Sequence, residues 1–280
     1  MKLRVTTLAE NSATGLGLLA EWGLSILVEV DDHSILLDTG RSIVAAHNSL
    51  FMNIDLTAIT KIVFSHGHED HTGGLPSLLK LRKKPIEIIA HPDVWDCKYW
   101  KTPGQTELSY IGIPYPRELA ESLGASFNLT DKPVWLGENI VTSGEVPMVT
   151  DFEAIDASAF VRTNGRFGPD PLKDDQTLFI KSAKGLVIIS GCAHRGIINT
   201  IKHAQSLTGC REVYAVIGGI HLFGATEERI ERTVKEFKQL DIQKIGVSHC
   251  TGPQASAVLA HEFKDKFCFN FSGTVIDFEV

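Results

Sequence analysis

The chain has 280 residues and a formal net charge of −7, with 43% hydrophobic and 22% charged residues. This length allows one large domain or two small ones, and the acidic balance argues against a nucleic-acid-binding protein. The chain has five cysteines, an odd number, and they are widely spaced. This argues against a disulfide framework and fits a reducing compartment. No apolar run approaches the roughly 18 residues of a membrane-spanning helix, and the N-terminus lacks a signal-peptide core, so we expect a soluble cytoplasmic protein.

The first half of the chain is predicted to consist mainly of strands. Residues Leu24–Val30 and Ser34–Asp38 flank a polar turn and indicate a β-hairpin. Helices are expected at Ile43–Leu50 and, after two glycines, within Gly73–Leu81. Further apolar runs predict strands at Leu3–Leu8, Thr60–Ser65, Ile86–Ala90, Val134–Leu136 and Ile140–Thr142.

Two segments of the chain lack a regular pattern. Residues 93–128 are predicted to be an insertion with one short helix, Pro116–Leu123, and its aromatic residues either form a substrate wall or pack against the domain. Residues 149–175 are rich in Asp, Gly, Pro and Arg and are predicted to be a long loop. That loop is either a lid that meets an anionic substrate through Arg162, Arg166 and Lys173, or a solvated, partly mobile segment.

The second half of the chain alternates between strands and helices. Residues Thr177–Lys181 and Leu186–Ser190 predict a hairpin, and Thr226 is a suitable cap for the helix that follows it. Helices are expected at Gly196–Leu207, Ala225–Leu240 and Pro253–Phe263. Strands are expected at Val213–Ile217, Lys244–Ser248, Lys266–Phe271 and Thr274–Phe278.

The chemistry of the sequence is concentrated in the stretch SHGHEDHTGGL, residues 65–75. His66, His68, Asp70 and His71 lie within six positions, between the end of a predicted strand and the start of a helix. Imidazole and carboxylate are ligands of zinc and of other divalent cations, and a loop allows such side chains to converge on one point. We therefore predict that these four residues bind metal.

Other histidines could contribute to the same site. His194, His221 and His249 each follow an apolar strand, and the C-terminal ends of strands commonly gather ligands in open α/β sheets. His91 also follows a strand, and whether it faces the site is left open. The histidines assigned to helix surfaces or to a solvated turn are His33, His47, His203 and His261.

These motifs resemble those of the metallo-β-lactamase fold superfamily. His66-x-His68-x-Asp70-His71 is similar to its signature motif. The other motifs that are similar to those of the superfamily are LLDTG at 36–40, ISGCAHRG at 189–196 and VSHCTG at 247–252. Within the superfamily the chain most resembles the dihydropterin-phosphate synthase-like branch, through its segments Glu21–Ser25, Ser65–His68, Ser190–His194 and Gly218–Leu222.

The resemblance implies an α/β protein with a four-layer αββα sandwich and a single domain over residues 1–280. It implies that Asp38 is a buried carboxylate behind the site and that His249 is the last metal ligand. Cys192 stands where relatives carry a bridging Asp or a Cys ligand, so it is either a metal ligand or a buried small residue whose place His194 takes. The usual third-motif His is absent from this sequence, and His194 is the nearest replacement, with Asp174 and Asp175 as weaker ones.

The same resemblance implies two divalent cations, with zinc as the first choice and manganese or iron as alternatives. One cation would be bound by His66, His68 and His194, and the other by Asp70, His71 and His249. Bound cations lower the pKa of water and generate hydroxide near neutral pH. Asp70 would also orient the nucleophile. His221 either contacts the substrate or bound water or packs against the site, and Gly218 and Gly219 would admit the substrate.

The function implied is a metal-dependent hydrolase or transferase that acts on a phosphorylated or pyrophosphorylated small molecule, for example a pterin. A phosphodiesterase, a lactonase or a thioesterase of the same fold remains an alternative, as does a metal-bound ligand sensor without catalysis. The expected partner is a small anionic substrate, not nucleic acid or a membrane, and the sequence makes no prediction of the oligomeric state.

Overall fold

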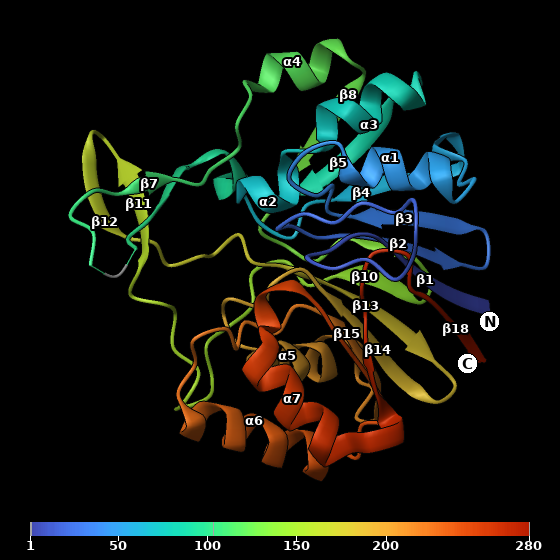
Figure 1. Cartoon of the computed structure of the whole chain (residues 1–280), viewed down its shortest axis with the longest axis vertical. Coiled ribbons are helices and arrows are strands. Elements are labelled where there is room, and N and C mark those ends of the chain that lie inside the picture. Colours follow the sequence, from blue (N-terminus) through green and yellow to red (C-terminus); the bar gives the residue numbers. More distant parts are fainter. Residues whose placement is uncertain (1, 103, 280) are drawn as a thin grey trace.

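Apolar runs in both halves of the chain form two seven-stranded sheets that pack face to face (Figure 1). The computed structural model describes residues 2–102 and 104–279. The strand order of the first sheet is β18 (Val275–Glu279), β1 (Lys2–Ala9), β2 (Ser25–Val30), β3 (His33–Leu37), β4 (Lys61–Val63), β5 (Ile86–Ala90) and β8 (Ala125–Leu129). The strand order of the second sheet is β17 (Phe267–Phe269), β16 (Lys244–Val247), β15 (Val213–Gly218), β14 (Gly185–Ser190), β13 (Thr177–Ser182), β10 (Ile140–Thr142) and β9 (Trp135–Gly137).

Helices cover the outer face of each sheet. The first sheet carries α1 (Val44–Phe51), α3 (Leu75–Arg82) and α4 (Arg117–Ser122), and the short α2 (Glu69–Thr72) precedes α3. The second sheet carries α5 (Ile197–Thr208), α6 (Glu227–Gln239) and α7 (Pro253–Phe263). Thr226 caps α6 as predicted, because its hydroxyl accepts the Arg229 N–H at 3.2 Å. No helix in the described part of the chain has the length and apolar character needed to cross a membrane.

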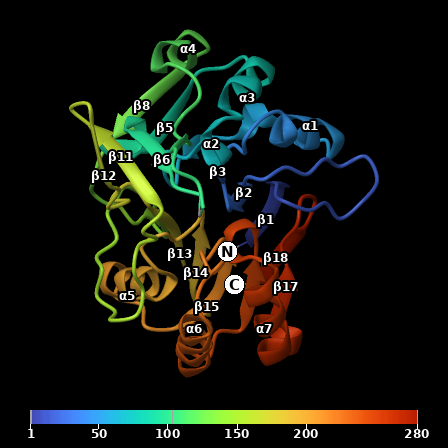
Figure 2. The same ribbon diagram turned by 60° about the vertical axis from the view of Figure 1, so that its left-hand side comes forward.

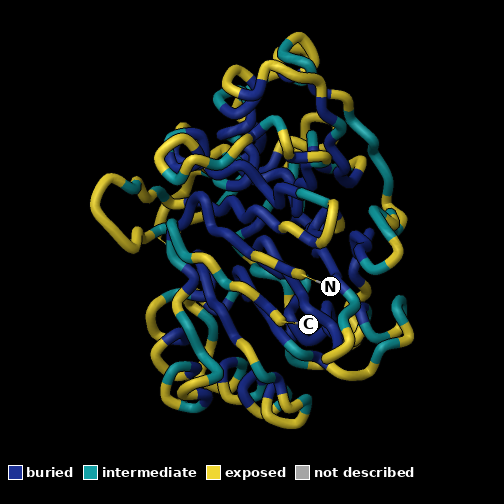
Figure 3. Tube along the Cα trace, turned by 90° about the vertical axis from the view of Figure 1, so that its right-hand side faces the viewer, coloured by how far each residue is buried: buried dark blue, intermediate teal, exposed yellow. Residues whose placement is uncertain are grey.

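Three apolar layers hold the sheets and helices together. The middle layer lies between the two sheets and contains residues of both, such as Val28 of β2 and Ile189 of β14. Side chains alternate along a strand, so Ile188 faces the other way and packs with Ile201 of α5. Figure 3 shows the buried trace running through the sheets while exposed residues lie on the outer helices and loops. The predicted four-layer αββα sandwich is therefore confirmed.

Parallel pairing brings the ends of several strands to one edge of the sandwich. In the first sheet β3, β4 and β5 pair in parallel, and in the second sheet β14, β15 and β16 do so. The segments that leave this edge begin at Phe64 after β4, at Gly191 after β14 and at Ser248 after β16. Each of these segments carries one of the histidine motifs, so the topology gathers motifs that lie far apart in the sequence.

A third sheet is present where the sequence indicated irregular structure. Its strand order is β12 (Arg166–Pro169), β11 (Ala159–Thr163), β6 (Cys97–Trp100) and β7 (Ser109–Tyr110). It projects beside the main sandwich (Figures 1 and 2). The helix predicted at Pro116–Leu123 is present as α4, but β6, β7, β8, β11 and β12 were not predicted. Since β6 pairs with the distant β11, these short strands carry little local signal.

The beginning of the second irregular segment is anchored to the sandwich. Glu153 is 4% exposed, and its carboxylate accepts the backbone N–H groups of Ile198 and Asn199 at 2.9 and 2.8 Å. Asn199 Oδ1 in turn accepts the N–H groups of Val149 and Thr150 at 2.8 and 2.7 Å. These contacts satisfy donors at the start of α5 and attach this part of the segment to the sandwich, although side chains such as Asp151 remain exposed.

Replacing Glu153 by Ala removes the acceptor for two buried N–H groups at the start of α5. We expect the free energy of unfolding, measured by urea denaturation, to fall by about 1–3 kcal/mol. Limited proteolysis should also cut residues 149–156 faster. Asp151→Ala is the matched control, because Asp151 is 79% exposed and pairs with Arg232 at the surface. Equal losses of stability in both variants would contradict the anchoring role of Glu153.

Candidate metal centre

Histidines that follow four different strands meet at one edge of the sandwich. His66 and His68 lie in the loop between β4 and α2, where the sequence predicted a loop. His194 follows β14, His221 follows β15, and His249 begins a turn of 3-10 helix after β16. All five side chains border the same region, so the structure brings together the motifs that the sequence singled out.

The first donor set consists of His66, His68 and His194. His66 Nε2 lies 2.9 Å from Nδ1 of His68 and 3.2 Å from Nε2 of His194. The three rings stand edge to face, with centroids 4.4 to 4.9 Å apart, and all three are buried. His194 therefore occupies the position that completes a three-nitrogen set with the two motif histidines.

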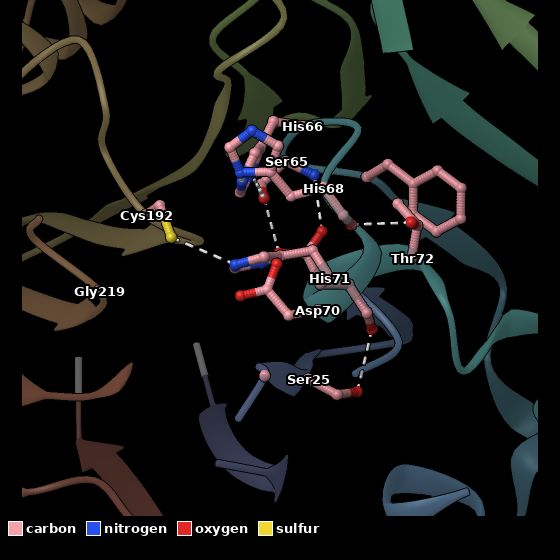
Figure 4. Close-up of polar contacts among 12 residues, drawn as sticks. Ser25, Ser65, His66, His68, Asp70, His71, Thr72, Cys192 and Gly219 are labelled. Carbon is pink, nitrogen blue, oxygen red and sulfur yellow. Dashed lines mark hydrogen bonds and ion pairs between the residues drawn. The ribbon is translucent and has the colours of Figure 1, made fainter. Parts of the chain in front are cut away.

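The second donor set consists of Asp70, His71 and His249. His71 Nε2 lies 3.3 Å from Nε2 of His249, which lies 3.2 Å from Oδ2 of Asp70. Cys192 Sγ lies 3.2 Å from His71 Nε2, and Figure 4 shows it directed at that ring. The Cys192 sulfur is also within 4.8 Å of donor atoms in the first set, so it stands between the two sets.

Hydrogen bonds behind the rings determine which ring nitrogens carry protons. The Ser65 hydroxyl donates its hydrogen to Asp38 Oδ2 at 2.6 Å. Ser65 Oγ is therefore left to accept Nδ1–H of His66 at 2.9 Å. His71 Nδ1–H donates to Asp38 Oδ2 at 2.7 Å. Neutral His66 therefore directs an unprotonated Nε2 atom at the other donors, and His71 does the same once a cation replaces the proton on its Nε2. Lone pairs that face one another repel, which indicates that a cation belongs between them.

The residues that orient His249 were missed from the sequence. Asn11 Oδ1 accepts Nδ1–H of His249 at 2.9 Å, and Glu10 Oε1 accepts the backbone N–H of His249 at 2.6 Å. These contacts hold His249 in a left-handed backbone conformation, with φ of +51°. Glu10 and Asn11 come from the loop after β1 in the opposite half of the chain, and no local motif marks them.

Charge and burial suit the two sets to metal binding. Burial, aided by neighbouring imidazoles, lowers the pKa of His66 and His194, which keeps them in the neutral form that binds metal. Burial opposes a charge on His71, but Asp38 and Asp70 raise the pKa of His71 to about 9. Burial also opposes ionisation of Asp70, but the nearby His71 lowers the pKa of Asp70. The second set thus attracts positive charge, which a proton or a divalent cation can supply.

The spacing of the donors fits divalent cations. In a tetrahedral site with zinc–nitrogen bonds of about 2.0–2.1 Å, neighbouring donors lie roughly 3.3–3.4 Å apart. The separations of His66 from His68 and His194, and of His249 from His71 and Asp70, are 2.9 to 3.3 Å. Imidazole, carboxylate and thiolate all bind zinc, and imidazole with carboxylate also suits iron and manganese. The two sets could therefore hold two adjacent cations, with Cys192 at their boundary.

The donor sets border a cavity of about 480 Å³. The aromatic side chains that line it are Trp22, Trp100, Tyr110 and Phe223. Arg41 is its one lysine or arginine within residues 2–102 and 104–279, and it pairs with Glu69 at 2.6 Å. His221 also lines the cavity, where its ring lies 4.1 Å from that of His194 and its Nδ1 has no partner within the described protein.

Several other predicted contributors lie outside this cavity. Arg162, Arg166 and Lys173 do not line it, so the lid that would bring them to an anionic substrate stays a prediction. Gly218 and Gly219 do not line it either. A Cβ atom at each would lie 2.0 and 2.3 Å from backbone oxygens at the end of β14, so these glycines permit close backbone packing rather than substrate entry.

The remaining candidates have structural contacts. Asp174 and Asp175 belong to no group of converging donor atoms in the described residues, and each accepts a backbone N–H from a loop that carries donors. His91 accepts the N–H of Asp93 and does not line the cavity. Of the insertion aromatics, Trp100 and Tyr110 line the cavity, whereas Trp95 and Tyr115 pack against the core under α3 and α4.

Comparisons with known proteins agree with this geometry. The family model of the metallo-beta-lactamase superfamily matches residues 23–199. The 7,8-dihydropterin-6-methyl-4-(beta-D-ribofuranosyl)-aminobenzene-5'-phosphate synthase of Methanocaldococcus jannaschii is 35% identical over 288 residues, which covers 99% of this chain and 97% of that protein. An uncharacterized protein of the same archaeon is 31% identical and covers 92% of this chain.

Solved structures show the same fold. Tm1679, described as a metal-dependent hydrolase of the beta-lactamase superfamily, has a TM-score of 0.84 and 29% identity, and the match covers 98% of each chain. The metallo-beta-lactamase fold protein YhfI from Bacillus subtilis has a TM-score of 0.59 at 14% identity and shows the fold alone. As its motifs predicted, the chain belongs to the metallo-beta-lactamase superfamily, and it is similar over nearly its whole length to a dihydropterin-phosphate synthase.

Proposed function

We propose that this protein is an enzyme with two divalent cations that acts on a phosphorylated or pyrophosphorylated small molecule, with a pterin as the leading candidate. The observation that carries this proposal is the meeting of two donor sets at the border of an aromatic cavity that also holds Arg41. The name of the 35% identical relative, a synthase of a dihydropterin-containing phosphate, supports the substrate class.

Each donor set would hold one cation. The residues proposed for the first cation are His66, His68 and His194, and those for the second are Asp70, His71 and His249. Cys192 lies within reach of both sets. When bound, the two cations supply Lewis acidity toward phosphate oxygens and lower the pKa of water. Zinc is the first choice, with manganese or iron as alternatives.

The cavity walls suit a planar, anionic substrate. Trp100 and Tyr110 come from the third sheet, while Trp22 packs edge-on against Phe223 at a centroid separation of 5.8 Å. Aromatic faces stack on planar heterocycles such as a pterin. The Arg41 guanidinium presents paired N–H groups that match phosphate oxygens, and a bound phosphate would compete with Glu69 for it.

Two polar side chains are placed to contact the reacting group. Asp70 lies at the cavity and its lowered pKa keeps it ionised, so its carboxylate can accept a hydrogen bond from a nucleophile and orient it. His221 is proposed to bind the substrate, because its ring lines the cavity beside His194 and its buried Nδ1 has no protein partner.

Hydrolysis is the second candidate, because the relative with a TM-score of 0.84 is described as a metal-dependent hydrolase. Two cations and Arg41 can serve a hydrolase or a transferase equally well, because in both reactions an anionic phosphate or pyrophosphate group leaves the substrate. Incubation of a dihydropterin pyrophosphate with and without a ribosyl-aminobenzene phosphate distinguishes them. Pyrophosphate release that requires the second compound indicates a transferase, and release without it indicates a hydrolase.

The purified protein should contain about two equivalents of divalent metal, measured by elemental mass spectrometry. His194→Ala should reduce this content to about one equivalent and abolish turnover, because the first set loses one of its three nitrogens. His47→Ala is the control, since His47 lies on α1 away from the cavity. A wild-type content of one equivalent or less would contradict the binuclear proposal, and ligand binding without turnover would favour the sensor alternative.

Asn11→Ala should weaken the affinity of the second cation site by about 10- to 100-fold, because His249 loses the acceptor that orients its ring. Competition with a chromogenic chelator measures this affinity. Asn128→Ala is the matched control, since the Asn128 amide donates to Glu87 on the first sheet. Unchanged metal affinity in Asn11→Ala would show that His249 does not depend on this contact.

Arg41→Gln should raise the KM for a phosphorylated substrate by about 10- to 100-fold, because it removes a charge-assisted hydrogen bond. The KM for the dephosphorylated analogue should change little. Arg162→Gln serves as the control, because Arg162 lies on β11 outside the cavity. Equal effects on both substrates would show that Arg41 does not recognise phosphate.

A further inference from the structure

Lys98 of β6 is a buried lysine close to the proposed metal centre. Its side chain is 1% exposed, and its Nζ lies 3.0 Å from Asp170 Oδ2 and 2.9 Å from Asp174 Oδ1. Burial opposes its charge, but Asp174 and Asp170 raise the pKa of Lys98. Because desolvation offsets much of the attraction in such a triad, its net contribution to stability is small. The triad matters instead because Asp174, one of its members, contacts the loop that carries His66 and His68.

Asp174 links Lys98 to the loop that carries the first two donors. Asp174 Oδ2 accepts the N–H of Gly67 at 2.8 Å, and Gly67 is the residue between His66 and His68. A Cβ atom at Gly67 would lie 3.1 Å from Lys98 Cε, so the lysine stem packs directly on this loop. The carboxylate thereby fixes the peptide plane between two histidines and, with it, the direction of their rings.

The next residue supports the third donor of the same set. Asp175 Oδ2 accepts the N–H of Arg195 at 3.0 Å, directly after His194. The adjacent Asp174 and Asp175 therefore hold the backbone of both loops that supply the first set. The second set depends on other contacts, so a change in the Lys98 triad should affect the two sets unequally.

Lys98 also belongs to the strand that builds the cavity wall. It lies two residues before Trp100, so both side chains point to the same face of β6. The carbonyl oxygen of Lys98 accepts the N–H of Ile111, whose own carbonyl oxygen accepts the N–H of Glu69 in α2 at 2.7 Å. The third sheet is thus attached to the metal loop at two points.

We propose that Lys98 is a positioning residue that acts through Asp174 and keeps the loop of His66 and His68 aligned with the aromatic wall of the cavity. Lys98 itself touches neither the metal nor the substrate. The inference rests on the proposed function only in taking His66, His68 and His194 as ligands of one cation.

The test compares metal affinities in variants that keep the charge of the triad. Lys98→Met combined with Asp170→Asn removes one charge of each sign and leaves Asp174 without its ammonium partner. Chelator competition should show that one of the two metal equivalents is bound about 10- to 100-fold more weakly while the other changes little. In a His194→Ala background, where the first site is already lost, the same pair of changes should have no further effect. Lys61→Met combined with Glu87→Gln is the charge-matched control, because Lys61 and Glu87 form a partly exposed ion pair on the first sheet.

Circular dichroism and thermal unfolding establish whether each variant is folded. If the double variant does not fold, Asp174→Asn tests the same link with a smaller change and should weaken the same site. Equal weakening of both sites, or unchanged affinities in a folded variant, would overturn the positioning role.

Hydrogen exchange separates this inference from the proposed function. In metal-free protein, the Gly67 amide should exchange at least about tenfold faster in the double variant, because its acceptor is no longer held. A wild-type protein that binds no metal would refute the proposed function. Unchanged exchange at Gly67 would refute the role of Lys98 even if the metal centre is real.

Discussion

The structure around the metal centre depends on one buried carboxylate, that of Asp38 at the end of β3. It accepts the Ser65 N–H at 2.7 Å, the Ser65 hydroxyl at 2.6 Å and Nδ1–H of His71 at 2.7 Å. Asp38 has a φ of +60°, a conformation that costs roughly 1–3 kcal/mol in a residue other than glycine. In return, one side chain joins the ends of two strands and turns the rings of His66 and His71 toward the donor sets.

Strained backbone conformations also occur in the second sheet, at residues that follow its parallel strands near the Asp38 carboxylate. Ala193, His221 and His249 have φ values of +54°, +47° and +51°, and each lies just after a parallel strand. A Cβ atom at Gly191 would lie 2.8 Å from Asp38 Oδ2, so the two halves of the sandwich are in close contact at this edge. Strain of this kind persists where surrounding contacts over-determine it, and here it places donors from both halves around one region.

The third sheet forms part of the cavity that lies beside the donor sets. Its strands supply Trp100 and Tyr110 to the wall, and Lys98 in the same sheet reaches the metal loop through Asp174. The aromatic cavity wall and the candidate metal donors are therefore parts of one connected structure. Arg41 adds a cation to the cavity lining, where it pairs with Glu69. The sandwich supplies the donors, whereas this sheet and Arg41 shape what can approach them.

Most strands and helices of the sandwich and the metal loop could be predicted from local signals: apolar runs of strand or helix length, and four ligand-type side chains within residues 66–71. Their four-layer arrangement was implied by the resemblance of the motifs to a known superfamily. His194 and His249 were also identified, since each follows an apolar strand. The third sheet, the Asn11 contact with His249, and the burial of Lys98 were decided only by the tertiary structure. Each of them depends on pairing between segments far apart in the chain, and hydrogen bonds or burial created by such pairing leave no periodic pattern in either partner.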